Sequence, residues 1–530
     1  MEGSREPRVS VVSRVTVPRR ALLVAVLAVM IGATALTGSA LGVLPACTDL
    51  AWGCQLAHDP PGSAGSNTAI AFDAGGSAWV SFRDQDAQAL MVASYVGAAG
   101  DCAGNQAWVC TVVDDPEGHD VGFETDIAFT ADGVAWVSYQ DTTTDDLKVA
   151  RTVVPGTGSG CAPSTTDWTC EAVDSSSQVG GYTAIAVENG APLVTYWDAG
   201  RNDLRWARPG SGAAACDTGG WSCGTVDSGA VGAYANDLAV DPSGRAWVAY
   251  RYSGSGTGPQ AAKLVIATHV VTGGSGCGSG SPEWSCSPVT KTGNVGLDTG
   301  IAFDAAGAPW VHYWNNNNLN LARLGGSGPR CSVAAAWECT TIHDTADSVG
   351  EYGGIAFDAS GAAWLAYHGA TTRHAYVAHY VGADAGSGCG SAGSTAWACS
   401  TLDASGDVGA FWMGIAIRPG SGEPWVSYYD RSNGALKVAI LQGAPTGGSA
   451  PVVTGFSPTS GPIGTSVIIS GSNLATTTEV TFGGTPAAFV VQPDGQIAAT
   501  VPVGAKTGPI TIMTPAGSTT TSQSFRVTKR

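Results

Sequence analysis

A small set of aromatic and acidic residues in this chain has the chemistry to bind a ligand. Trp197, Trp314 and Trp412 stand outside the two positions that tryptophan fills regularly in this sequence. The same stretches of chain also hold Tyr182, Tyr234, Tyr352, Glu124, Asp126, Asp237, Asp298 and Glu351. Aromatic rings beside carboxylates suit sugars, cationic peptides or Ca²⁺. Ordinary packing of loops would explain the same residues without a ligand.

The sequence contains no recognised catalytic motif. No His-Glu-x-x-His pattern, nucleophile elbow or P-loop occurs. Gly388–Gly393 satisfies a dinucleotide-binding glycine pattern, but no helix is expected after it, as such a site requires. Asp73 and Asp358 lie at Gly-containing turns, where turn hydrogen bonds explain them. No catalytic residue, metal ligand or cofactor is therefore assigned, and Ca²⁺ is the one ion that the carboxylates would suit.

An internal repeat is expected to position these residues. A short apolar strand occurs seven times at intervals of 53 to 63 residues, from Ile70–Phe72 to Ile415–Ile417. Each copy continues with a glycine turn and a second strand such as Ala78–Phe82. A third strand such as Leu147–Ala150 and a fourth such as Trp108–Val113 follow. Four short strands per unit, without helical periodicity, predict the blades of a β-propeller.

The phase of the repeat predicts how the propeller closes. The chain enters with a lone fourth strand, Trp52–Leu56, and ends with a third strand, Leu436–Leu441. The N-terminal outer strand should therefore complete the last blade of an all-β, seven-bladed propeller over residues 47–442. A linear solenoid, the alternative, would not need this offset. Because strands alternate in direction, the loop entering each blade shares a face with the loop after its second strand, and these loops should carry the candidate residues.

The 14 cysteines follow the repeat. They form local pairs in which the second member always lies two residues after a tryptophan. The expected disulfides are Cys47–Cys54, Cys102–Cys110, Cys161–Cys170, Cys216–Cys223, Cys277–Cys286, Cys331–Cys339 and Cys389–Cys399. No pair has the close spacing that zinc sites prefer. One disulfide per blade, each tying the outer strand to the loop before it, indicates an oxidising compartment.

The N-terminus reads as a targeting segment. Residues 1–20 hold five arginines, and residues 21–46 hold no charged side chain. This pattern predicts a secretory signal over residues 1–40 or, if it is not cleaved, a membrane anchor. The formal net charge of −18 argues against a nucleic-acid partner, because phosphate contacts need a basic surface.

A second domain follows a Gly-rich linker, residues 443–450. Short alternating strands between Gly and Pro turns predict a small β-sandwich over residues 451–528. The segment closely resembles the IPT/TIG family of immunoglobulin-like domains. The motifs that carry the resemblance are Pro451–Pro462, Val480–Ala487, Val501–Pro502, Thr507–Pro509 and Thr514–Gly517. The resemblance implies an extracellular spacer or adhesion module without catalysis.

The repeats resemble those of large secreted bacterial proteins, as in Gln178–Val187 and Leu193–Asp198. They also resemble sialidase propellers at a distance, but Asp358–Trp364 has one residue more than the Asp-box of that family. We expect a secreted, surface-bound or periplasmic bacterial protein that binds an extracellular glycan or protein. A membrane would be contacted only through an uncleaved N-terminal segment. A glycoside hydrolase or lyase and a purely structural envelope protein are the alternatives.

Overall fold

The computed structural model describes residues 47–528, except 164, 177, 211–215, 217, 230–232, 234–235, 254–261, 279–281, 292–293, 383–384, 391, 443–450, 473, 475–476, 478, 492–495 and 515–516. The regular elements of the described residues are all strands. Among these residues, none forms a helix capable of spanning a lipid bilayer. The predicted signal or anchor, residues 1–40, lies outside them.

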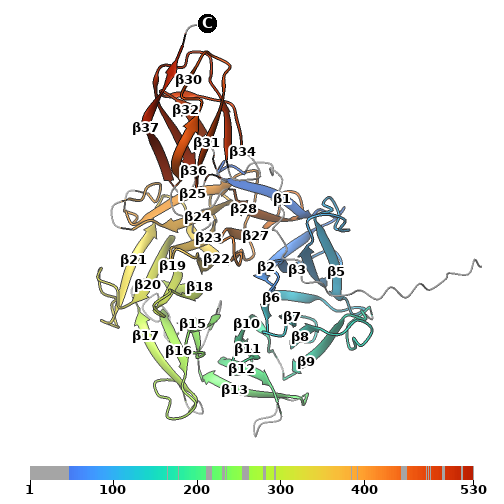
Figure 1. Cartoon of the computed structure of the whole chain (residues 1–530). Coiled ribbons are helices and arrows are strands. Elements are labelled where there is room, and N and C mark those ends of the chain that lie inside the picture. Colours follow the sequence, from blue (N-terminus) through green and yellow to red (C-terminus); the bar gives the residue numbers. More distant parts are fainter. Residues whose placement is uncertain are drawn as a thin grey trace, which may run out of the picture. The chain divides into compact units, whose positions relative to one another are not determined.

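Residues 52–441 form seven antiparallel sheets of four strands each (Figure 1). The first two comprise β2 (Ala64–Phe72), β3 (Ala78–Asp84), β4 (Ala89–Tyr95) and β5 (Trp108–Asp114), and β6 (Val121–Phe129), β7 (Ala135–Asp141), β8 (Asp146–Thr152) and β9 (Trp168–Asp174). The next two comprise β10 (Gly181–Glu188), β11 (Ala191–Asp198), β12 (Asp203–Pro209) and β13 (Trp221–Asp227), and β14 (Asp237–Val240), β15 (Ala246–Ser253), β16 (Ala262–His269) and β17 (Trp284–Thr290).

The fifth and sixth sheets comprise β18 (Val295–Phe303), β19 (Pro309–Asn315), β20 (Asn318–Leu324) and β21 (Trp337–His343), and β22 (Val349–Phe357), β23 (Ala363–Gly369), β24 (His374–Tyr380) and β25 (Trp397–Asp403). The seventh contains β26 (Gly414–Ile417), β27 (Pro424–Asp430), β28 (Ala435–Leu441) and the N-terminal β1 (Trp52–His58). β1 pairs antiparallel with β28, so that the two ends of this region share one sheet.

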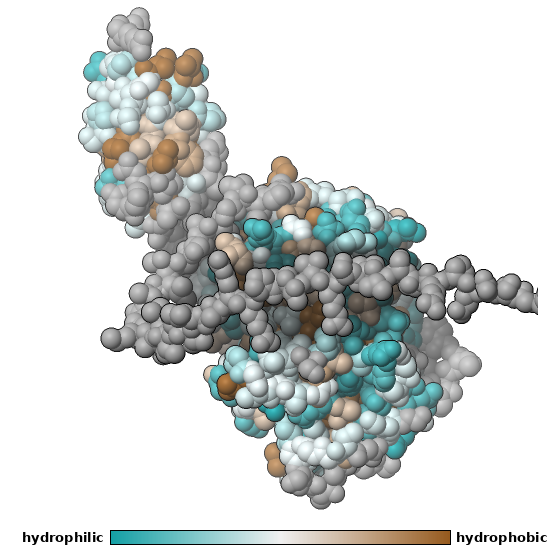
Figure 2. Space-filling model, turned by 90° about the vertical axis from the view of Figure 1, so that its right-hand side faces the viewer, coloured by the Kyte–Doolittle hydropathy of each residue, from teal (hydrophilic) through white to brown (hydrophobic). Residues whose placement is uncertain are grey.

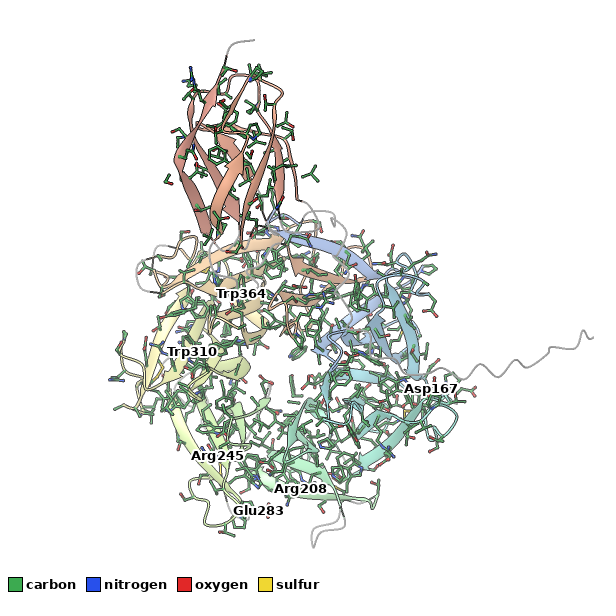
Figure 3. The ribbon with its side chains drawn as sticks, in the orientation of Figure 1. Asp167, Arg208, Arg245, Glu283, Trp310 and Trp364 are labelled. Atoms are coloured by element: carbon green, nitrogen blue, oxygen red, sulfur yellow. A yellow bond between two sulfur atoms is a disulfide. The ribbon has the colours of Figure 1, made fainter. Side chains whose placement is uncertain are left out.

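The seven sheets are typical of propeller blades. The first strand of each sheet contacts the first strand of the next, and β26 of the seventh sheet contacts β2 of the first. Both faces of a sheet are covered by its neighbours, which explains second strands such as β23 and β27 in which every residue is buried. Trp310, for example, packs edge-on against Phe357 and Trp397 of the following sheet. Trp310 and Trp364 lie within the sheets, whereas Arg208 and Glu283 of neighbouring sheets lie together at the outer edge (Figure 3).

Buried hydrogen bonds also join successive sheets. The hydroxyl of Tyr139 in β7 donates to Asp114, the last residue of the preceding outer strand. Tyr196, Tyr250 and Tyr428 make the same bond to Asp174, Asp227 and Asp403. Burial and the adjacent carboxylates keep the pKa of Tyr139 well above its ordinary value, so the hydroxyl remains a donor. Each bond satisfies two polar groups that would otherwise be costly inside the fold.

The turn aspartates act within their own sheets. Asp73 Oδ1 accepts hydrogen bonds from the N–H groups of Gly75 and Ser77, and Oδ2 accepts one from the indole of Trp79. Asp358 holds Trp364 in the same way. The interpretation of these residues as turn residues is therefore confirmed.

All seven predicted disulfides are present, and no cysteine in the described part of the chain is free. Each closes a loop of 7 to 10 residues between an outer strand and the segment before it. The first, Cys47–Cys54, ties the segment before β1 to β1, the strand whose partner in the sheet, β28, is not adjacent in sequence.

The C-terminal region forms two sheets of its own. One contains β29 (Val452–Ser457), β31 (Ser466–Ser472), β35 (Ile497–Thr500) and β34 (Phe489–Val491). The other contains β30 (Ser460–Gly461), β37 (Gly517–Val527), β36 (Gly508–Thr514), β32 (Glu479–Phe482) and β33 (Thr485–Pro486). Val467, Ile469, Phe482, Ile510 and Phe525 form the core between them. Apolar residues also lie in separate patches on the surface of this domain (Figure 2).

The disulfide on β1 should matter more for local opening than the others. Replacing both Cys47 and Cys54 by serine removes about 2.5 kcal/mol of loop-closure stabilisation in the chain-entropy model. Replacing Cys102 and Cys110 removes a similar amount from a strand that is covalently continuous with its sheet. Amide hydrogen exchange should therefore accelerate in β28 for the first double variant and not for the second. Equal protection of β28 in both variants would show that the disulfide does not hold β1 in place.

Candidate functional site

One position of the repeat, at the start of the first strands, directs its side chains toward a cavity that these strands line. Residues with positive φ occur at equivalent positions of six copies, in the first strands or, for the seventh sheet, just before it: Asn67, Glu124, Tyr182, Asp298, Tyr352 and Trp412. The pairing of the first strand with the second shifts register at this position in five sheets. Such a bulge re-aims side chains, and a positive φ in bulky residues such as Tyr182 and Trp412 is uncommon. The bulge thus brings one variable position of the repeat to one place.

A second repeat position faces the first. It lies near the end of the second strands, which pair antiparallel with the starts of the first strands. Trp197, Arg251 and Trp314 occupy it in three successive sheets. We expected the candidate residues in loops, and this was wrong for most of them. They lie inside strands β6, β10, β11, β14, β18, β19 and β22, because the first strands begin several residues earlier than the apolar triplets indicate. Among the candidates that the structure describes, Trp412 alone lies in a loop, before β26.

The first strands line a cavity of about 270 Å³, which we call the central cavity. Four of the predicted carboxylates line it: Glu124, Asp126, Asp237 and Asp298. Asp126 accepts hydrogen bonds from the N–H groups of Ile127 and Ile185, both at 2.8 Å. Asp237 accepts equivalent bonds from Leu238 at 2.9 Å and Ile301 at 2.7 Å. These carboxylates therefore join the first strand of one sheet to the first strand of the next.

Burial dominates the titration of these groups. It raises the pKa of Glu124, Asp237 and Asp298 to about 7 and that of Asp126 to about 6. Backbone hydrogen bonds oppose the rise at all four positions. The negative charge of Glu351 raises the pKa of Asp298 further, and the Arg251 guanidinium lowers it. At neutral pH these carboxyl groups are therefore partly protonated and can donate as well as accept hydrogen bonds.

Aromatic rings from distant sheets meet beside this cavity. The ring of Trp412, before β26, lies 5.9 Å from Tyr182 of β10 and 5.1 Å from Tyr352 of β22. Tyr182 also lies 6.3 Å from Trp197. The rings are inclined by 54° to 61°, so no pair is stacked face to face. The structure thus gathers Tyr182, Trp197, Tyr352 and Trp412 from three sheets.

A second cavity of about 410 Å³ combines both kinds of side chain, and we call it the aromatic pocket. It is lined by Tyr182, Arg251, Leu297, Asp298, Trp314, Glu351, Tyr352 and Trp412. The indole N–H of Trp314 donates to Ser348 Oγ at 3.2 Å, and Ser348 Oγ donates to Glu351 at 3.0 Å. Trp314 and Glu351 are thereby fixed relative to each other.

Of the predicted residues, Trp314, Glu351 and Tyr352 lie in the aromatic pocket, and Glu124, Asp126 and Asp237 in the central cavity. Tyr182, Asp298 and Trp412 line both. Trp197 lies in a smaller neighbouring recess of about 220 Å³, with Tyr182 and Glu124. Tyr234 lies outside the described residues. The structure adds Arg251 and Leu297, and Arg251 could have been found from its place in the repeat column of Trp197 and Trp314.

The described residues give little support for a metal centre among the carboxylates. The one group of three metal-ligating side chains within reach of one another is His58, Cys102 and Cys110, and its two cysteines form a disulfide. No third carboxylate or imidazole of the described residues converges with Asp298 and Glu351 in this way. Calcium requires six to eight oxygen ligands.

The comparison with known proteins identifies the C-terminal domain. Residues 451–527 match the family model of the IPT/TIG domain, as their sequence motifs indicated. No curated protein matches the chain.

Solved structures with a similar arrangement have low sequence identity. A fungal alcohol oxidase with copper is 13% identical, with 90% of this chain and 99% of that chain covered and a TM-score of 0.41. A polysaccharide lyase of the ulvan lyase type is 11% identical, with 72% and 94% covered and a TM-score of 0.43. An arabinofuranosidase of Fusarium graminearum is 10% identical, with 59% and 91% covered and a TM-score of 0.37. At these values, the chemistry of those proteins does not transfer to this chain.

The buried carboxylates predict a pH-dependent stability. Because their pKa values lie above those of an unfolded chain, these carboxyl groups bind more protons in the folded state between about pH 4 and pH 7, and the stability that they contribute falls as the pH rises through this range. His312, His343 and His368, whose pKa values burial lowers to about 4, contribute in the opposite direction. Asp237→Asn keeps an acceptor for the Ile301 N–H and removes one carboxylate, so its melting temperature should rise relative to that of the wild type between about pH 5 and about pH 8.

Asp358→Asn is the control, because hydrogen bonds hold the pKa of Asp358 below its ordinary value, so that it is ionised throughout this range. It should leave the difference between the two pH values unchanged. An Asp237→Asn variant whose melting temperature does not rise relative to that of the wild type between the two pH values would contradict the assignment.

Proposed function

We propose that this chain is a secreted glycan-binding protein and that the aromatic pocket is its binding site. The observation that carries the proposal is the convergence of Tyr182, Trp314, Tyr352 and Trp412 with two carboxyl groups and Arg251 in one cavity. Binding pockets of this kind pair apolar walls with a few convergent polar groups. The apolar face of a sugar ring packs on aromatic rings, while its hydroxyls need donors and acceptors.

The polar groups of the pocket suit a ligand that carries hydroxyls. Burial, Asp298 and Glu351 raise the pKa of Tyr352, so its hydroxyl stays protonated. Burial is also the main cause of the raised pKa of Glu351. The indole N–H of Trp314 is bonded to Ser348, so that what remains of this side chain for a ligand is its apolar ring.

The proposal includes the arrangement of the whole chain. Residues 47–442 form a closed seven-bladed propeller, with β1 as the outer strand of the last blade, which places the first strands around one centre. Residues 1–40 direct secretion or anchor the chain, and 451–528 are a spacer or adhesion module. Seven disulfides support an extracellular or periplasmic location, and the repeats resemble those of bacterial proteins.

Alanine at Trp314 and Trp412 tests the glycan site. After a glycan array has identified a ligand, each variant should weaken binding by at least about tenfold, or about 1.4 kcal/mol, because each removes one aromatic wall. Phe411→Leu is the control: Phe411 is 38% exposed beside Trp412 but does not line the pocket. Calorimetric titration gives the affinities. Unchanged binding in both tryptophan variants would place the glycan elsewhere.

Glycoside hydrolysis is the second candidate, because Asp298 and Glu351 are two neighbouring carboxyl groups whose pKa values are both raised. A carboxyl group that remains protonated near neutral pH is suited to act as a general acid. Incubation with polysaccharides should then release new reducing ends, and Asp298→Asn should abolish this release. Binding without any release, in the wild-type protein, would favour the binding function.

A further inference from the structure

We propose that the aromatic pocket recognises the ammonium group of an amino sugar, so that the glycan ligand is cationic. This inference deepens the proposed function and rests on it. It follows from four aromatic side chains and two carboxyl groups that line the same cavity.

The aromatic walls suit a cation that is surrounded by apolar surface. Tyr182, Trp314, Tyr352 and Trp412 approach from four different sheets, since β10, β19, β22 and the loop before β26 belong to separate sheets. The Trp412 ring is inclined to both Tyr182 and Tyr352, which leaves the three rings unstacked. An ammonium group over such rings gains a cation–π interaction that strengthens when water is excluded.

The charges of the pocket favour a cation as well. Asp298 of β18 is faced by Glu351 and Tyr352 of β22 and by Arg251 of β15. Glu351 is faced by Ser348 and by the charge of Asp347, which directly precede β22. Arg251 also donates to Asn294 at 2.9 Å. With both carboxyl groups ionised, two negative charges stand against one positive charge, and a bound ammonium balances them.

Other ligands fit the same groups less well. An anionic sugar would bring a third negative charge beside Asp298 and Glu351. A calcium ion would find two carboxyl groups among aromatic rings instead of the six to eight oxygens that it requires. A neutral sugar would bury the two carboxyl groups further without a positive charge to balance their negative charges.

A matched pair of small probes tests the charge alone. Choline carries a fixed positive charge, and 3,3-dimethylbutan-1-ol has nearly the same shape without it. In calorimetric titrations of the full chain at about pH 8, where Asp298 is ionised, choline should bind at least about tenfold more tightly. Its affinity should fall toward about pH 5, as Asp298 takes up a proton. His368, which contacts the ring of Tyr352, does not charge in this range because burial lowers its pKa to about 4.

Variants assign the effect to the pocket. Asp298→Asn retains the shape and an acceptor for the Tyr352 N–H and should remove the preference for choline. Asp227→Asn is the control, because Asp227 is also a buried carboxylate bonded to a backbone N–H, at Gly278, but lies outside the pocket. It should keep the preference. Melting curves of both variants identify any loss of folding.

A glycan pair then distinguishes this inference from the proposed function. Glucosamine oligomers should bind more tightly than N-acetylglucosamine oligomers of equal length at about pH 7, where the amino groups and Asp298 both carry partial charge. Equal binding of both oligomers, with choline no better than its neutral counterpart, would overturn the inference while the glycan-binding function stands. Choline binding at the pocket without binding of any glycan would instead overturn the proposed function.

Discussion

The bulge at the start of the first strands is the feature on which the rest of the site depends. A first strand that is covered on both sides normally presents small or apolar residues, and Ala71, Ala128 and Ala302 follow this rule within the apolar triplets. At the bulge the register shifts and φ becomes positive, so one side chain per sheet is released from regular pairing. That side chain can then vary without loss of the sheet. Glu124, Tyr182, Asp298, Tyr352 and Trp412 all occupy this one position.

Hydrogen bonds between sheets hold the bulged strands in register with one another. Asp126 and Asp237 each span from one first strand to the N–H of the next, and the tyrosine–aspartate pairs do the same nearer the outer strands. Since Asp126 and Asp237 are only partly exposed, the fold maintains them at a cost that is lowest when they are protonated. The packing that fixes the strands therefore also raises the pKa values of these carboxyl groups. Rigid strands and a low-dielectric surrounding are the conditions under which a ligand group is recognised by charge.

The sequence correctly predicted the features that depend directly on the period of the repeat. It predicted the strand order, the seven cysteine pairs and the role of turn aspartates such as Asp73, because each depends on spacing along the chain. It also selected Trp314, Tyr352 and Trp412 as departures from the repeat. It could not predict that Trp412 meets Tyr182, because that contact depends on how separate sheets face one another. It placed the carboxylates in loops, because an alternating pattern does not reveal where a bulged strand begins. Their raised pKa values follow from burial, which has no local sequence pattern.

The proposed function depends on one structural claim, namely that the ligand lies among the rings of Trp314, Tyr352 and Trp412. A crystal structure of the full chain with a glucosamine oligomer tests it most directly. We predict one sugar ring in the aromatic pocket, with its amino group within hydrogen-bonding distance of Asp298 or Glu351. An oligomer bound elsewhere on the sheets or on the C-terminal domain, with this pocket empty, would contradict the account.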